Sequence, residues 1–426
     1  MHSLRTNSAR PSIGREQQLR EAVLLTFCEP LRTECTRLLK LSRLEWQRLL
    51  HWLDISGLAL YFLDRVRELG LSEMLPAEVI ARLEQNLADS TVRIDAMIAD
   101  STAIQREFLN ARLSYAVVKG FSLWPESVPK LALRSQLDLD FLVAQESADE
   151  ARRILESRGY HLHAISGRSW EFKSNEGKTP SLKDMYKAGL SRSVELHLEV
   201  GHVSSARLTS MLSRTEHRSL HGLLVPVLSP VDLFLGQGLH MFKHVCSEFA
   251  RAAHLIEFRR HILARHDDVK FWQLLQQQTA SDTDACIRLG LVIQLISHVM
   301  GDFAPPALTS WTVDRLPAAA FDWVRLYGRR SVLASIPGSK LYLLLQSALE
   351  GAGLPAKRSL RQSLLPHRLP PSIAHGTADE TLWKRLNRYR RQIHFILSRL
   401  RFHIVEGLHY LLESARWRNL RNGLAQ

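Results

Sequence analysis

The chain has 426 residues, of which 45% are hydrophobic, so it is long enough to bury a sizeable core in two or three domains. Its four cysteines are scattered and form no CxxC pair, so they indicate neither a disulfide framework nor a structural zinc site, and they favour a cytoplasmic location. The polar, basic N-terminus is no secretory signal, and no window reaches the ~18 uninterrupted apolar residues of a membrane span. We therefore expect a soluble or at most peripheral protein.

The N-terminal third is predicted to be helical. Residues 16–112 carry apolar side chains at helical spacing with few Gly or Pro, which gives an N-terminal helical region over 1–111. From Tyr115 the pattern changes to short apolar runs separated by turns. Over roughly ninety residues within 112–225 this predicts the order β-α-β-α-β-β-β, which is typical of an α/β or α+β unit rather than a sandwich, and we expect the α+β class.

The elements expected in this unit follow one another closely. They are a strand at 116–118, a helix from 121 to 126, a strand ending at Val143, a helix at 146–158 stopped by Gly159, strands at 160–165 and 170–173, a hairpin or mobile loop between Gly167 and Gly189, and a strand at 193–200. Helical texture then returns over 226–350. Four prolines and three glycines within 351–378 predict a linker over 351–377.

The last segment, residues 378–426, is predicted to be a basic amphipathic helix, with a helix pair as the alternative. From residue 356 to the end there are fourteen Lys and Arg against four Asp and Glu, so this segment carries +10 of the formal +13. Three interpretations stay open: a solvated helix face, a surface for an acidic partner or nucleic acid, and a helix on a membrane surface.

Two aspartates on one strand need an explanation. Asp138 and Asp140 stand two residues apart in LDLDFLV, so their side chains share one face of a strand. Aspartate is depleted in strands, and this pair fits either a solvated edge or a cation site about equally well. Three neighbours favour the cation site.

The first neighbour is the turn Lys119-Gly120-Phe121-Ser122, which is expected to open a helix whose backbone N–H groups cradle a phosphate. The second is Arg134, whose planar fork suits a phosphate. The third is Glu195, on a later strand, which adds a third carboxylate. Three hard oxygen donors suit Mg²⁺, and two such ions about 3.5–4 Å apart clamp a phosphoryl displacement.

In this order, the motifs resemble the polymerase-β-like nucleotidyltransferase superfamily. The similarity is greatest to the bacterial family described as uncharacterised nucleotidyltransferases, and it covers residues 112–260. The matching motifs are Lys119-Gly120, Arg134, Asp138-Leu139-Asp140 followed by Leu142-Val143, and Glu195 followed by His197. Lys-Gly-Phe-Ser departs from the Gly-Ser or Gly-Gly that is commonest in the superfamily. The resemblance implies a nucleotidyltransferase palm over 112–225, with a small mixed sheet.

The resemblance also implies an activity: Mg²⁺-dependent transfer of NMP from an NTP, with ATP expected, to an unknown acceptor. Asp138, Asp140 and Glu195 are predicted as catalytic residues and metal ligands. Nucleotide contacts are predicted for four residues, Lys119, Gly120, Ser122 and Arg134. Accessory candidates are His197 and the group His240, Lys243 and His244 on one helix face, for which a structural role is at least as good an explanation.

Two rival functions stay open. One is a catalytically inactive palm that binds a nucleotide or a partner. The other is a helical adaptor that binds an acidic partner through the basic C-terminal helix. The acceptor has no motif in this sequence, because acceptor choice is a property of the site and not of the fold.

Overall fold

A computed structural model describes residues 14–174, 184–199, 210–351, 353–354, 360–364 and 381–424. Residues 1–13 of the predicted N-terminal helical region, most of the predicted linker and both ends of the predicted C-terminal helix lie outside these residues. By its internal contacts the chain forms two compact units. The first holds the described residues of 12–242 and 251–315, and the second holds those of 243–250 and 316–426.

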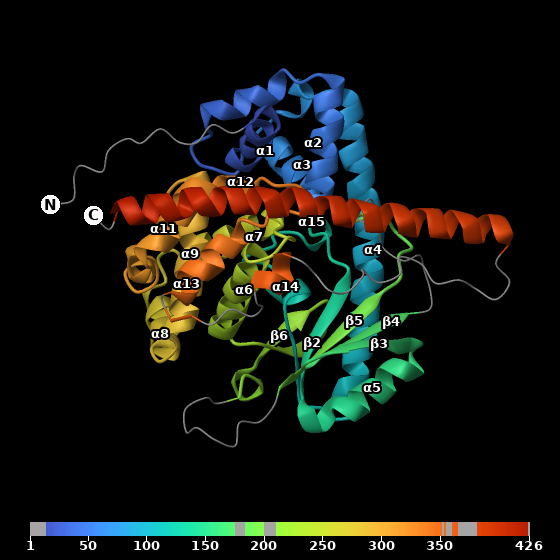
Figure 1. Cartoon of the computed structure of the whole chain (residues 1–426). Helices are drawn as coiled ribbons and strands as arrows, with labels where there is room; N and C mark the ends of the chain where they lie inside the picture. The colour runs from blue at the N-terminus through green and yellow to red at the C-terminus, as the bar shows by residue number, and fades with distance from the viewer. Residues whose placement is uncertain are drawn as a thin grey trace. The chain divides into compact units, whose positions relative to one another are not determined.

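Helices make up most of the described chain (Figure 1). In the first unit they are α1 (Arg15–Leu25), α2 (Arg43–Ser56), α3 (Ala59–Glu68), α4 (Ala77–Asn110), α5 (Ala148–Ser157), α6 (Pro230–Val245, whose last turn belongs to the second unit), α7 (Ala252–Ala264), α8 (Val269–Thr279), α9 (Thr283–Met300) and α10 (Pro306–Thr309). In the second they are α11 (Ala318–Trp323), α12 (Arg329–Val332), α13 (Tyr342–Glu350), α14 (Leu360–Leu364) and α15 (Leu382–Leu424).

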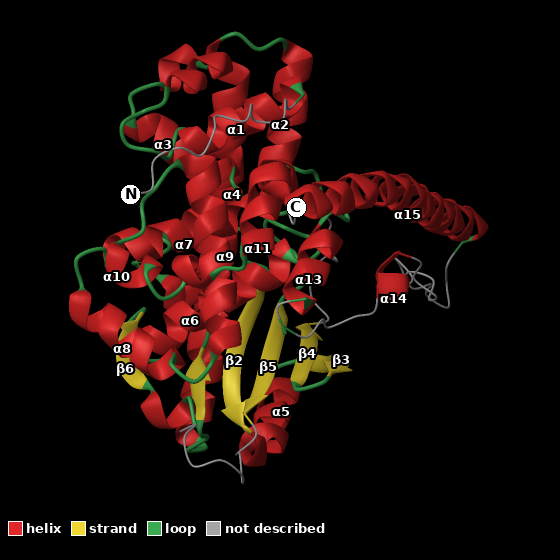
Figure 2. Ribbon diagram, turned by 60° about the vertical axis from the view of Figure 1, so that its left-hand side comes forward, coloured by secondary structure: helices red, strands yellow, loops and turns green. Residues whose placement is uncertain are grey.

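Among the described residues of the first unit, seven strands form one mixed sheet, seen in yellow in Figure 2. The strands are β1 (Tyr115–Val117), β2 (Asp138–Ala144), β3 (Tyr160–Ser166), β4 (Ser169–Ser174), β5 (Ser193–Glu199), β6 (Glu216–Leu220) and β7 (Leu223–Val227), in the order β3-β4-β5-β2-β1-β7-β6. The pairs β2–β5 and β1–β7 are parallel and the others antiparallel. This confirms the predicted α+β class.

The alternation of β2 divides its side chains between two differently covered faces. Leu139, Phe141 and Val143 are buried in a core cluster with residues of α4 and α5. On the opposite face, Leu142 packs in a second cluster that includes Leu233 of α6. Asp138 and Asp140 share the face of Leu142, because side chains two residues apart on a strand point the same way. The aspartates therefore point to the side that α6 covers.

Two predictions for the palm differ from the structure. The helix expected from residue 121 is wrong: Gly120–Leu123 forms only a short 3₁₀ turn. The Lys119 carbonyl accepts both the N–H and the hydroxyl of Ser122, and Pro125 has no N–H with which to extend a helix. The sequence also does not predict the hairpin of β6 and β7, because Pro226 within β7 argues against a strand.

Two further helices bear on membrane contact. By length and composition α9 is apolar enough to cross a membrane, with a mean hydropathy of 1.3, but 67% of it is buried inside the fold. That burial is typical of the core helix of a folded domain, so α9 is weak evidence for a span. In the second unit, α15 is one continuous helix of 43 residues, where the sequence left a helix pair open.

Candidate active site

The strands β2 and β5 bring the predicted carboxylates together. They run parallel and in register, with Asp140 opposite Glu195 and Leu142 opposite His197. Because paired residues on adjacent strands point to the same face, Asp140, Glu195 and His197 meet on the side of α6. Asp140 is buried, whereas Asp138, Glu195 and His197 are half-buried. The register therefore converts two distant motifs into one site.

Lys119 lies at the centre of this site. Its Nζ is 2.8 Å from Asp140 Oδ1, 3.0 Å from His197 Nε2 and 3.7 Å from Glu195 Oε2. His197 Nε2 is also 3.0 Å from Asp140 Oδ1 and 3.5 Å from Glu195 Oε2. We call these four residues the carboxylate cluster. Asp138 stands next to it on β2, and no hydrogen bond to its carboxylate is found among the described residues.

The turn after β1 explains how Lys119 reaches the cluster. Lys119 has φ +55°, a left-handed conformation that non-glycine residues rarely adopt, and Gly120 follows with φ +42°. A Cβ on Gly120 would lie 2.3 Å from Nε2 of Gln136, which itself donates to the Asp138 carbonyl at 2.7 Å. Gly120 is thus required by the turn and by its close contact with Gln136. Backbone strain of this kind is concentrated at functional sites.

The cluster separates the proton affinities of its two aspartates. Burial raises the pKa of Asp140, but hydrogen bonds from His197 and Lys119 outweigh it and hold that pKa below its usual value. Burial and the charge of Asp140 together raise the pKa of Asp138 to about 6. Burial lowers the pKa of Lys119, but the negative charge of Asp140 outweighs that effect. The pKa of Lys119 is therefore above its usual value, and the side chain is an ammonium. Two neighbouring carboxyls with such different pKa values are typical of a functional site.

A divalent cation would fit here through Asp140, Glu195 and His197. One ligand atom from each of the three lies within 4.8 Å of the others. Two carboxylate oxygens and one imidazole nitrogen are a donor set for Mg²⁺, Mn²⁺ or Zn²⁺, with oxygen favouring the harder ions. Glu195 is oriented by the hydroxyl of Ser169, which the sequence did not single out. The Lys119 ammonium lies against the same three side chains, so it competes with such a cation.

Arg134 is placed differently from its prediction as a phosphate contact. Its Nε lies 3.2 Å from Glu257 of α7, and its guanidinium also donates to Gln136 at 3.3 Å. The hydroxyl of Tyr61 donates to the same Glu257 oxygen at 2.9 Å. Burial lowers the pKa of Arg134, but Glu257 and Tyr61 outweigh it and raise it. Arg134 is thus already paired; its role as a nucleotide contact stays a prediction.

The other residues predicted for the site are not members of the carboxylate cluster. Ser122 is fully buried and its hydroxyl donates to the Lys119 carbonyl at 2.7 Å. His240 lies on α6 with its ring centroid 5.5 Å from that of His254. Lys243 and His244 belong to the segment 243–250 of the second unit, where His244 Nδ1 is 3.0 Å from the Phe249 carbonyl.

A cavity of about 290 Å³ adjoins the carboxylate cluster. Lys119 and His197 form part of its wall, and Arg134 and Glu257 form another part. Nine of its other lining residues are aliphatic or methionine: Val118, Leu123, Leu142, Met211, Leu228, Leu233, Leu235, Leu239 and Met241. The candidate site is therefore a charged cluster beside a mainly apolar pocket.

Comparisons with known proteins agree with this chemistry in part. The family model described as an uncharacterised nucleotidyltransferase matches residues 42–301. The crystal structure of an antigenic nucleotidyltransferase-like protein from Paracoccidioides brasiliensis is similar to 51% of this chain and 99% of its own, at 14% identity and a TM-score of 0.30. A search of curated proteins found no match.

Proposed function

This chain belongs to the uncharacterised nucleotidyltransferase family, and we propose that it transfers a nucleoside monophosphate from a nucleoside triphosphate, with ATP as the expected donor, to an acceptor hydroxyl. The family match confirms the resemblance seen in the motifs and extends it from 112–260 to 42–301. The observation that supports this proposal best is the in-register pairing of Asp140 with Glu195, with Asp138 on the same strand face.

The proposed reaction forms one bond and breaks one. The acceptor oxygen attacks the α-phosphorus, the bond from that phosphorus to the bridging oxygen breaks, and pyrophosphate leaves with the electron pair. We assign the acceptor proton to the Glu195 carboxylate, which Ser169 orients. Asp140, Glu195 and His197 would hold one Mg²⁺, and Asp138 with Asp140 a second. When bound, Mg²⁺ polarises the phosphate and neutralises developing charge.

Lys119 has to change partner in this proposal. Its ammonium contacts Asp140, His197 and Glu195, which are the ligands assigned to the cation. Two positive charges at one set of ligands repel each other, so Lys119 would leave Asp140 if these ligands held a divalent ion. Its side chain is 35% exposed, which gives it room to move. The released ammonium is then available to a phosphate oxygen.

The same lysine supports a second candidate function. An ammonium that neutralises Asp140 in place of a metal also suits a palm that binds a nucleotide or partner without turnover. In that case Lys119 stays on Asp140, and the nucleotide binds without divalent ions.

The test is transfer of label from radiolabelled ATP to a pool of small metabolites in the presence of Mg²⁺. We expect Asp140→Asn to lower transfer by roughly 10²–10³-fold, the size typical of losing one electrostatic group at a reacting centre. Asp267→Asn, at a side chain that is 98% exposed, is the control for the loss of one carboxylate and should keep full activity. Equal transfer by wild type and Asp140→Asn would refute the proposal. ATP binding by calorimetry without any transfer would support the second candidate.

A further inference from the structure

The cavity beside the carboxylate cluster is built for an apolar group. Its wall between the sheet and α6 is mainly aliphatic, and its described lining residues include no Phe, Tyr or Trp; the rings among them are the imidazoles of His197, His240 and His254. At about 290 Å³ it lies at the lower end of the roughly 300–1,000 Å³ of ligand pockets, so it takes one group and not a whole nucleotide.

The polar groups in its wall are mostly occupied by other residues of the chain. Asp232 accepts from Arg214 at 2.8 and 3.0 Å and from Ser229 at 2.7 Å. Glu257 is engaged with Arg134 and Tyr61, as described above. They are therefore poor partners for the polar edge of a purine or a sugar. Lys119 and His197 of the carboxylate cluster also line the cavity.

We propose that the acceptor is an aliphatic alcohol, whose alkyl or alicyclic body fills this cavity and whose hydroxyl lies at the carboxylate cluster. This inference rests on the proposed function for the hydroxyl, but the binding of the apolar body stands by itself. Burial of apolar area contributes about 25 cal/mol per Å², so a pocket of this lining discriminates by chain length.

The test measures binding without nucleotide or metal, so that it does not depend on transfer. Unbranched alcohols from 1-butanol to 1-decanol are added to the full chain, and the rise in melting temperature is recorded. We expect a rise of about 2–4 °C up to a cut-off length. Leu239→Phe should move that cut-off to shorter alcohols and Leu239→Ala to longer ones. Leu274→Phe and Leu274→Ala, at an exposed residue of α8 outside the cavity, should leave it unchanged.

Each outcome decides between the two proposals. The aliphatic acceptor is overturned if the Leu239 variants leave the cut-off in alcohol length unchanged. It is also overturned if the folded protein binds none of the alcohols. Displacement of the alcohol by adenosine also overturns it, because the cavity would then belong to the nucleobase. Alcohol binding with no label transfer from ATP would leave the cavity assignment intact and refute the transferase.

An independent observation concerns α15 in the second unit, which carries a long exposed apolar stripe. Nine large apolar side chains that are 47–84% exposed recur along it: Leu382, Leu386, Tyr389, Ile393, Leu397, Leu400, Ile404, Leu408 and Leu411. The same three positions repeat every eleven residues, and eleven residues complete about three helical turns. The stripe therefore stays on one side of the helix over most of its length.

The opposite part of α15 contacts its own unit. Arg399 pairs with Glu248 at 3.1 Å, Glu413 accepts from Tyr327 at 3.2 Å, and Trp417 is buried. The stripe is thus not the face that packs the helix onto the second unit. A contiguous exposed apolar surface of this kind marks an interaction site.

Charge decides which partner fits. Residues 382–424 hold ten Lys and Arg against two acids, Glu406 and Glu413. Both acids have partners within the second unit: Glu406 accepts from the Lys340 backbone N–H at 3.2 Å, and Glu413 pairs with Arg416 at 2.9 Å. A second copy of α15 would bring like charges together, and an eleven-residue repeat lacks the 3.5-residue period of ordinary coiled coils. Nucleic acid would not cover an aliphatic stripe.

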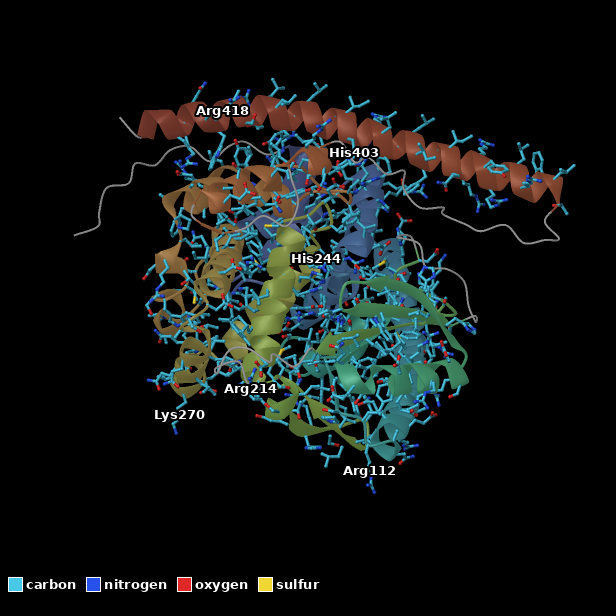
Figure 3. The ribbon with its side chains drawn as sticks, turned by 60° about the horizontal axis from the view of Figure 1, so that its bottom comes forward. Arg112, Arg214, His244, Lys270, His403 and Arg418 are labelled. Carbon is cyan, nitrogen blue, oxygen red and sulfur yellow. The ribbon has the colours of Figure 1, made fainter. Side chains whose placement is uncertain are left out.

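We propose that α15 lies on an anionic lipid surface, with the stripe in the acyl boundary and the arginines at the headgroups. Arg390 and Arg401 are exposed and follow Tyr389 and Leu400 directly, so they flank the stripe and can extend toward headgroups. Side chains project from α15 along its length, including the labelled Arg418 (Figure 3).

The test is co-sedimentation of the full chain with vesicles of phosphatidylcholine containing 30% phosphatidylglycerol. We expect pelleting that weakens in 0.5 M NaCl and is far lower with pure phosphatidylcholine. Ile393→Glu/Leu400→Glu should weaken binding about tenfold or more. Asn387→Glu/Ser398→Glu makes the same charge change at exposed positions off the stripe and should weaken it much less. The lipid assignment would be overturned if the two double variants lost binding equally or if the protein did not pellet with vesicles. A dimer in ultracentrifugation that buries the stripe would also overturn it.

Discussion

Two groups of charged residues in the first unit have opposite character. Arg134 and Glu257 form a closed pair, with side chains 16% and 4% exposed, and Tyr61 donates to the same carboxylate. In the carboxylate cluster, Lys119 is 35% exposed, and its single ammonium is shared among Asp140, Glu195 and His197. The sequence predicts the same role, a contact with the nucleotide, for Lys119 and Arg134. The structure gives a fixed partner to Arg134 and several exchangeable ones to Lys119.

The difference indicates which charges serve the fold and which are available for chemistry. A buried ion pair loses more than it gains when one partner is removed, because the other charge stays buried and unpaired. A half-exposed cation that touches three potential ligands can exchange one for another with less desolvation. We therefore expect stability to depend on Arg134 and Glu257, and activity on the carboxylate cluster.

The largest effect is expected from breaking the closed pair. Arg134→Met should lower the free energy of unfolding by about 3–5 kcal/mol, because Glu257 is left as an uncompensated buried charge. Urea unfolding followed by circular dichroism measures it. The double variant Arg134→Met/Glu257→Leu should recover part of the loss. A single variant as stable as wild type would mean that Arg134 is free to serve the nucleotide.

Next comes the removal of the ammonium from the cluster. Lys119→Met should lower nucleotidyl transfer about 10²-fold, since a phosphate contact is lost. The same variant should bind Mn²⁺ more tightly, because the ammonium no longer competes for Asp140. Calorimetry with Mn²⁺ alone measures the second effect without any need for turnover. Weaker Mn²⁺ binding by Lys119→Met would contradict the proposed exchange of partners.

A third expectation concerns acid and a buried histidine. His261 on α7 lies 2.7 Å from Gln237, and burial, aided by Arg265 and Arg218, lowers its pKa to about 3. Its unfolded pKa is near 6.5, so the unfolded state binds more protons between these values. This histidine therefore costs stability as the pH falls below 6.5, roughly 2 kcal/mol between pH 7 and 5. His261→Gln should flatten that part of the stability curve; an unchanged slope would show that His261 is protonated in the fold.

The smallest effect is expected at the turn that presents Lys119. Gly120→Ala should destabilise the fold by about 1–2 kcal/mol, because it combines a positive φ with a contact at 2.3 Å to Gln136. Gly159→Ala is the matched control: its φ is +81°, but nothing lies within 4 Å of the added Cβ. The excess loss in Gly120→Ala over Gly159→Ala, measured by thermal unfolding, isolates the steric part. Equal losses would remove the special role of this turn.

Much of this fold was predictable, for reasons local to each segment. The N-terminal helices follow from apolar side chains at helical spacing, and the end of α5 follows from Gly159 with its positive φ. Asp138 and Asp140 had to share a strand face because strand side chains alternate. The helix predicted after Lys119 does not form, because two hydrogen bonds from Ser122 to the Lys119 carbonyl close a short turn instead. The β6–β7 hairpin was not predictable, because Pro226 within β7 argues against a strand.

The sequence by itself determined which groups were available and in what order: the Lys119-Gly120 turn, the aspartate strand, the Glu195-Leu196-His197 strand and the apolar stripe of α15. Only the tertiary structure decided which of them meet. The register of β2 against β5 places Asp140 beside Glu195. Packing also places Glu257 against Arg134, although the two are 123 residues apart in the sequence. Periodicity is a property of the local backbone, whereas an ion pair depends on where distant segments pack, and this is why Lys119 and Arg134 differ only in the folded chain.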